Sequence, residues 1–152
     1  MSYVQRVLQS GEEVRYLAGL HWILYLPGVV FVVAAGVVLF VARNAEHANY
    51  FWLIAAGGLG LVALYLLFHA WFDRWTTEIA VTNRRIIYKT GFIRRETNEM
   101  HMDKVESVRV DQSVLGRLLD YGDVNVIGTG TGFEPLRRIA APLDLRNHIT
   151  GV

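Results

Sequence analysis

The pattern of hydrophobic and polar positions divides the chain into an apolar part near the N-terminus and a mixed part after it. No Asp, Glu, Lys or Arg occurs from Tyr16 to Ala42, and none occurs from His47 to Phe72. Each run exceeds the ~20 residues that a helix needs to cross the hydrocarbon core of a bilayer. The polar link from Arg43 to Asn49 is short, so the runs predict an antiparallel transmembrane hairpin with spans at about residues 22–42 and 51–72.

Beyond Asp73 the apolar positions recur at every second residue, which is the period of half-buried strands. Short turns separate the alternating segments, and hairpin-linked strands favour an antiparallel sheet. The predicted strands cover residues 75–81, 85–90, 92–100, 104–111, 123–129 and 133–141. A closing helical turn is predicted over residues 142–149.

One segment breaks this alternation and predicts a short helical turn. Ser113 can cap the turn, and Leu115, Leu118 and Leu119 then point inward. The predicted core of the domain consists of Ile79, Val81, Ile87, Val105, Val108, Val110, Leu115, Leu118, Val124 and Val126.

The first 21 residues form a polar tail with its own local pattern. Val14, Tyr16, Ala18 and Leu20 fall on one face at period two and predict a strand that leads toward the membrane. A short interfacial helix over residues 3–8 is an equal alternative. The chain is therefore expected to consist of a tail (1–21), a transmembrane hairpin (22–72) and a small domain (73–152).

Positive charges near the ends of the spans predict the orientation of the hairpin. The link carries only Arg43. The segments before and after the hairpin carry more cations, namely Arg6, Arg15, Arg74, Arg84, Arg85 and Lys89. Because Lys and Arg accumulate on the cytoplasmic side, we expect a multi-pass protein of the cell membrane, inner or plasma, with both termini in the cytoplasm.

A cleaved signal peptide is the competing interpretation of the first run. Glu12 and Glu13 stand where such a peptide carries positive charge. The run is also longer than the ~7–15 apolar residues of a signal peptide. A retained span is the better interpretation.

Composition narrows the possible functions of the domain. Residues 73–152 hold 12 Lys and Arg against 11 Asp and Glu, so their net charge is +1 and they offer no large basic field for nucleic acid. The chain has no cysteine, which excludes disulfides, thiolate zinc sites and thiol nucleophiles. No residues are assigned to a metal or a cofactor.

Two sets of residues are candidates for contacts with lipid or with other helices. Five cations of the first two hairpins could lie against anionic lipid headgroups: Arg84, Arg85, Lys89, Arg94 and Arg95. Small residues of the second span could pack against the other helix of the hairpin or against a second copy of the chain: Ala56, Gly57, Gly58 and Gly60. The second set, together with a sheet edge that so small a domain would leave unpaired, makes a homo-oligomer the expected state.

An enzyme and a pore are the alternative functions. In a strand, Glu99, His101 and Asp103 fall on one face and could form an acid–base pair or a metal site, although a solvated strand face has the same pattern. A pore or transport subunit would need polar residues along the spans, which offer only Tyr25, Tyr65 and glycine. Neither alternative is favoured.

Three stretches resemble the bacterial pleckstrin-homology (PH) family of membrane proteins. They are VTNRRII at residues 81–87, MDKVESVRV at residues 102–110, and LGRLL at residues 115–119 with YGDV at 121–124. The resemblance implies an α+β membrane protein in which a PH-like barrel of seven antiparallel strands, closed by a short C-terminal helix, follows the hairpin. Six strands are predicted after residue 73, which leaves the Tyr16 region or a split strand to supply the seventh.

The resemblance carries no recognised catalytic residues. We therefore expect a non-catalytic interaction or scaffold module that is anchored in the lipid bilayer, assembles with itself and binds other membrane proteins.

Overall fold

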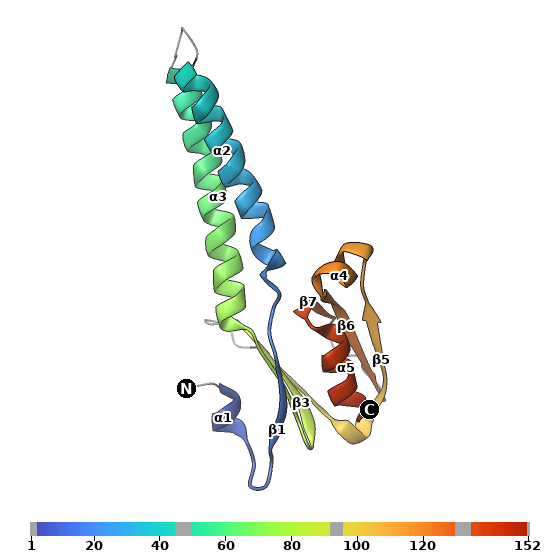
Figure 1. Ribbon diagram of the computed structural model, residues 1–152. Helices are drawn as coiled ribbons and strands as arrows, with labels where there is room; N and C mark the ends of the chain where they lie inside the picture. Colours follow the sequence, from blue (N-terminus) through green and yellow to red (C-terminus); the bar gives the residue numbers. More distant parts are fainter. Residues whose placement is uncertain (1–2, 45–49, 92–95, 130–134, 152) are drawn as a thin grey trace. The chain divides into compact units, whose positions relative to one another are not determined.

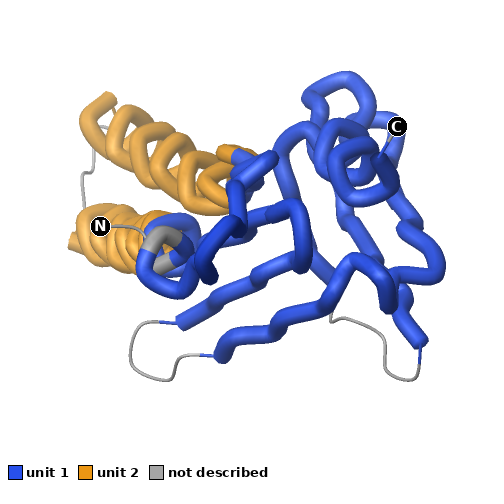
Figure 2. The backbone as a smooth tube through the Cα atoms, turned by 90° about the horizontal axis from the view of Figure 1, so that it is seen from below, with its two compact units in different colours: residues 1–21, 73–152 blue, residues 22–72 orange. Residues whose placement is uncertain are grey.

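The computed structural model describes residues 3–44, 50–91, 96–129 and 135–151. The chain divides into two compact units, one formed by residues 22–72 and the other by residues 1–21 together with residues 73–152 (Figure 2). The tail and the C-terminal domain, which the sequence pattern separates, therefore form a single unit.

The unit of residues 22–72 consists of two long apolar helices, as predicted. A 3₁₀ turn, η1 (Trp22–Tyr25), leads into α2 (Leu26–Asn44), and α3 (Tyr50–Thr76) follows. Both helices are long and apolar enough to cross a membrane. The helix α3 continues past the predicted end at Phe72, and the Thr77 N–H still donates to the Asp73 carbonyl at 3.0 Å. The strand predicted from residue 75 consequently begins only at Glu78.

Small residues mark the buried side of each long helix. Gly28, Ala35 and Ala42 are buried on α2, and Ala56, Ala63 and Ala70 are buried on α3. The spacing of seven residues keeps each set on one face. A Cβ atom at Gly28 would lie 2.6 Å from the side chain of Leu67, so this glycine permits the close approach of α2 to α3.

The second unit contains two antiparallel sheets, visible in Figure 1. The first sheet has the order β1-β2-β3-β4, formed by Val14–Ala18, Glu78–Thr82, Arg85–Thr90 and Glu96–His101. The second has the order β5-β6-β7, formed by Val105–Asp111, Tyr121–Gly128 and Leu136–Ala140. A bridge between Leu20 and Ile139 joins the sheets at one corner, and the barrel is not closed.

The N-terminal tail supplies the seventh strand. Strand β1 pairs with β2 in antiparallel register, with Ala18 opposite Ile79. The tail also contains a short helix, α1 (Tyr3–Val7), so both elements considered for the tail, the strand and the helix over residues 3–8, are present. Val4 of α1 is only 1% exposed and packs with Ala80 and Ile87 on the face of the first sheet turned away from the core.

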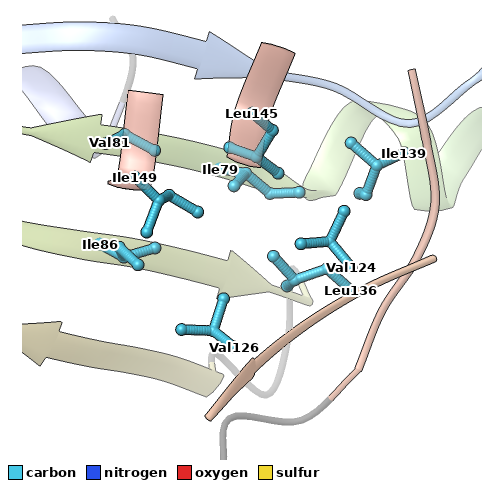
Figure 3. Packing of buried hydrophobic residues seen from close by; sticks show 9 residues of the cluster. All are labelled: Ile79, Val81, Ile86, Val124, Val126, Leu136, Ile139, Leu145 and Ile149. Carbon is cyan, nitrogen blue, oxygen red and sulfur yellow. The ribbon is translucent and has the colours of Figure 1, made fainter. Parts of the chain in front are cut away.

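The main core lies between the two sheets and under α5 (Pro142–Thr150), as Figure 3 shows. The predicted residues Ile79, Val81, Val124 and Val126 are buried there. Val105, Val108 and Val110 pack against this core and are half-buried, whereas Ile87 belongs to the smaller cluster under α1. Further buried residues that pattern reasoning omitted are Ile86, Leu136, Ile139, Leu145 and Ile149.

The orientation predicted for the short helix α4 (Val114–Leu119) is wrong. Leu115 is 62% exposed and Leu118 is 79% exposed. The buried residue of this helix is Gly116, where a Cβ atom would lie 2.6 Å from the carbonyl oxygen of Tyr121. A close contact with the sheet is possible here only through a residue without a side chain, so Leu115 and Leu118 face outward. Leu119 is half-buried.

A matched pair of leucine truncations tests this core. We expect Leu136→Ala to lower the free energy of unfolding by about 2–5 kcal/mol, because Leu136 is fully buried. The control Leu118→Ala should change it by no more than about 0.5 kcal/mol, because that side chain is exposed. Urea unfolding in mild detergent, followed by circular dichroism, measures both; equal losses would contradict the assignment.

Candidate functional site

The guanidinium of Arg85, at the start of β3, donates four hydrogen bonds. Its Nε and Nη2 atoms donate to the two carboxylate oxygens of Glu12, each at 2.9 Å. Its Nη1 atom donates to Glu99 Oε2 at 2.7 Å, and Nη2 also donates to the Val7 carbonyl at 2.9 Å. The pair with Glu12 has the bidentate geometry that arginine forms with a carboxylate.

Both carboxylate oxygens of Glu12 accept hydrogen bonds from other groups in addition to Arg85. Glu12 lies in the turn between α1 and β1, where the Gln9 N–H donates to Oε2 at 2.9 Å and the Thr82 hydroxyl donates to Oε1 at 2.8 Å. Burial by itself would raise the pKa of Glu12. The hydrogen bonds from Arg85, Gln9 and Thr82 outweigh burial and lower this pKa from 4.5 to about 2.

This network connects the N-terminal segment to three strands of the first sheet. Arg85 belongs to β3, Thr82 to β2 and Glu99 to β4. In the described part of the chain, no buried side-chain nitrogen or oxygen lacks a hydrogen-bond partner. A satisfied, buried ion pair of this kind fixes one arrangement of the backbone, and its role here is structural.

The network corrects the prediction for one of the five lipid-facing cations. Arg85 is 7% exposed and its donors are engaged, so it is not available to a lipid headgroup. Arg84 is exposed. The Lys89 side chain is largely covered and its Nζ lies 4.0 Å from Glu78 Oε1. Arg94 and Arg95 lie outside the described residues.

The three residues of the alternative acid–base site, Glu99, His101 and Asp103, lie in different surroundings. Glu99 binds Arg85, and His101 lies opposite Arg85 in the register of β3 and β4. Asp103 follows in the 3₁₀ turn η2 (Met102–Lys104), where it is exposed. Among the residues that the structure describes, no group of three His, Asp or Glu side chains could hold a metal ion.

The second sheet carries a polar hollow of about 490 Å³ on the face turned away from the core. Asp123 and Asn125 of β6 point outward because they alternate with the buried Val124 and Val126. The lining consists of Asp111, Tyr121, Asp123, Asn125, Pro135, Arg137 and Arg138. Two carboxylates and two guanidinium groups give the hollow no single sign of charge, so it does not form an anion site.

The small residues of α3 differ in their surroundings. Ala56 is buried, and Gly60 is half-buried. Gly57 and Gly58 are exposed, and a Cβ atom at either would meet nothing within 4 Å. These two glycines therefore lie away from the buried side of the helix.

Sequence reasoning missed Glu12 as a partner of Arg85 and missed the hollow. The available signals were an acidic residue, Glu12, next to Gly11 in a turn and an arginine, Arg85, directly before the apolar positions of a strand. Those signals do not identify the partner, because the two residues lie 73 positions apart in the chain.

Comparison with known protein families gives one match. Residues 16–151 match the family model described as "Bacterial PH domain". The match begins within β1 and ends after α5, so it includes the helical hairpin as well as both sheets. No curated protein and no solved structure gives a significant match.

The buried carboxylate makes stability depend on pH. We expect Glu12→Gln to lower the free energy of unfolding at pH 7 by about 2–3 kcal/mol, because hydrogen bonds to charged groups contribute about that much. Since folding lowers the pKa of Glu12 to about 2, its contribution is complete above pH 4.5 and is lost as the pH falls toward 2. The difference between the two proteins should shrink over that interval.

Denaturant unfolding at several pH values measures this difference, and Arg85→Lys is the matched variant. Lysine keeps the charge but cannot form the bidentate pair, so it should also destabilise the protein. A difference between wild type and Glu12→Gln that stayed constant from pH 7 to pH 2 would refute the role of the carboxylate.

Proposed function

The chain belongs to the bacterial PH domain family, and from that premise we propose that it is a non-catalytic, membrane-anchored module. It holds a PH-like domain at the cytoplasmic face of the cell membrane, where the domain binds other membrane proteins and further copies of the chain. Two properties support a binding role over a catalytic one. Glu99, one of the acid–base candidates, forms an ion pair with Arg85, and the PH domain family is typically non-catalytic.

The observation that carries this proposal is the position of the hairpin within the fold. Helices α2 and α3 are inserted between β1 and β2, which are hydrogen-bonded neighbours in one sheet. The two ends of the hairpin must therefore lie on the same side of any membrane that the helices cross. Two crossings satisfy this requirement, and a single crossing does not.

The surface of the helices favours lipid as their surroundings. Large apolar side chains cover their outer sides, and examples are Phe40, 70% exposed, and Ile54, 73% exposed. A helix in the core of a soluble protein would bury such residues. A cleaved signal sequence is also disfavoured, because cleavage after α2 would remove β1 from the sheet that it completes.

The orientation follows from charge. The link between the helices contributes only Arg43. The segments that flank the hairpin in the sequence contribute Arg6, Arg15, Arg74, Arg84, Arg85 and Lys89. This bias favours a multi-pass protein with residues 43–49 outside and both termini in the cytoplasm.

Self-assembly is the second part of the proposal. Gly57 and Gly58 leave a shallow surface on the outer side of α3, where the backbone of another helix could approach closely. In lipid, such close packing is a main source of helix association, because apolar side chains gain little by leaving the acyl chains.

Cysteine labelling tests the topology, since the natural chain has no cysteine. In intact cells, a membrane-impermeant maleimide should label Glu46→Cys in the link and should not label Thr150→Cys near the C-terminus. Both variants should react after the cells are opened. Labelling of Thr150→Cys alone in intact cells would show the opposite orientation to the one proposed. Labelling of both variants would show that the link and the C-terminus lie on the same side of the membrane.

Two glycine substitutions test self-assembly. We expect Gly57→Leu to reduce the oligomer seen by native mass spectrometry in mild detergent, because the added side chain prevents close approach. The control is Gly36→Leu on α2, whose Cβ also meets nothing within 4 Å. Only monomers for the wild type, or equal effects of both substitutions, would contradict the assignment of this surface.

A further inference from the structure

The helix α4 presents an apolar surface that the fold does not use. Val114, Leu115 and Leu118 are 80%, 62% and 79% exposed, and we call them the α4 apolar face. They occupy positions i, i+1 and i+4, which lie together on a helix, while Gly116 lies on the opposite side against the sheet. Three neighbouring large apolar residues in water are unfavourable for a domain of this size.

The surrounding structure holds this face rigidly outward. The Ser113 hydroxyl oxygen accepts from the Gly116 N–H at 3.0 Å and caps the helix at its start. At its end, Asp120 adopts a left-handed conformation and donates its N–H to the Gly116 carbonyl. The Gln112 side chain donates to the Tyr121 carbonyl at 3.2 Å. The apolar face is therefore part of an ordered helix and not of a loop that could fold inward.

The location of α4 points to what covers this face. Gly116 packs against the backbone of Tyr121, and the ring of Tyr121 stacks on His21 with 5.2 Å between ring centroids. His21 is itself fixed, since its N–H donates to the Arg138 carbonyl at 2.8 Å. The next residue in the chain is Trp22, the first of the candidate membrane span. Along this path, the side chains of Tyr121 and His21 lie between Gly116 and the residue at which the candidate span begins.

We propose that the α4 apolar face inserts into the headgroup region of the leaflet that Trp22 enters. The inference rests on the proposed membrane-spanning role of α2 and α3. Interfacial apolar segments insert about 5–10 Å, and α4 is linked to the first residue of the span through Tyr121 and His21. Arg117 on α4 and Asp120 at its C-cap are both exposed and cancel in charge, so the insertion is driven by apolar surface and does not require anionic lipid.

Fluorescence quenching in the full-length chain tests this insertion. Leu118→Cys and Val114→Cys are labelled with an environment-sensitive fluorophore and reconstituted in phosphatidylcholine vesicles. The control is Glu106→Cys, an exposed position at the opposite end of the strand β5 that leads to α4. A second control is Leu64→Cys, an outward position of α3 that is 65% exposed.

We expect lipids with a shallow spin label to quench both α4 probes several-fold more than the Glu106→Cys probe. The emission of the α4 probes should also shift to the blue. Aqueous iodide should show the reverse order, and added anionic lipid should change neither result.

Three outcomes would overturn the inference. Iodide quenching of the α4 probes equal to that of the Glu106→Cys probe would show that the α4 apolar face lies in water. Protection from both quenchers would mean that protein covers it, either a second copy or a partner. A requirement for anionic lipid would make the contact electrostatic. In each case, quenching of the Leu64→Cys probe by deep spin labels would show that α3 still spans the membrane. Quenching of the Leu64→Cys probe by aqueous iodide would instead contradict the proposed spanning role.

Discussion

The pairing of β1 with β2 is the constraint on which the rest of the structure depends. It joins residues on either side of the helical hairpin in one sheet, with Val14 opposite Thr82 and Ala18 opposite Ile79. Because of this pairing, the N-terminal tail is an integral part of the domain, and the hairpin is an insertion between two neighbouring strands. The domain has two covalent connections to the hairpin, so its rotation about either one is restricted by the other.

The Arg85 network stabilises the first sheet where β2 ends and β3 begins, by joining Thr82 and Arg85 to Glu12 in the turn before β1. Removing two charges from water is costly, and a buried ion pair is by itself weak evidence of stability. Here the cost is offset by additional donors and acceptors, since Thr82, Gln9 and Val7 supply hydrogen bonds around Glu12 and Arg85. The network thereby holds the turn before β1 against the sheet while Val4 of α1 covers the neighbouring apolar positions.

Much of this fold could be predicted from local patterns. Alternating polarity located the strands after Glu78, and charge-free runs located the two helices, because both signals depend only on nearby residues. The resemblance to the PH family, which the family match bears out, added the seven-stranded arrangement. The two main errors have different physical causes. For α4, the contact with the sheet depends on the absence of a side chain at Gly116, and a hydrophobic pattern favours leucine at the same place. For Arg85, the decisive partner Glu12 lies in a distant part of the chain.

The insertion of the hairpin between β1 and β2 also determines the order of events during synthesis. The ribosome makes β1 before both helices, so this strand emerges without a partner and can pair only after residues 78–82 are complete. Closing so long a loop is entropically costly for a flexible chain, but a helical hairpin brings its own ends together and reduces that cost. Formation of the helical hairpin, which the proposed insertion into the bilayer would promote, therefore favours completion of the sheet. A chain whose helices failed to insert as a pair would leave the edge of β2 uncovered, in the exposed state that promotes aggregation and degradation.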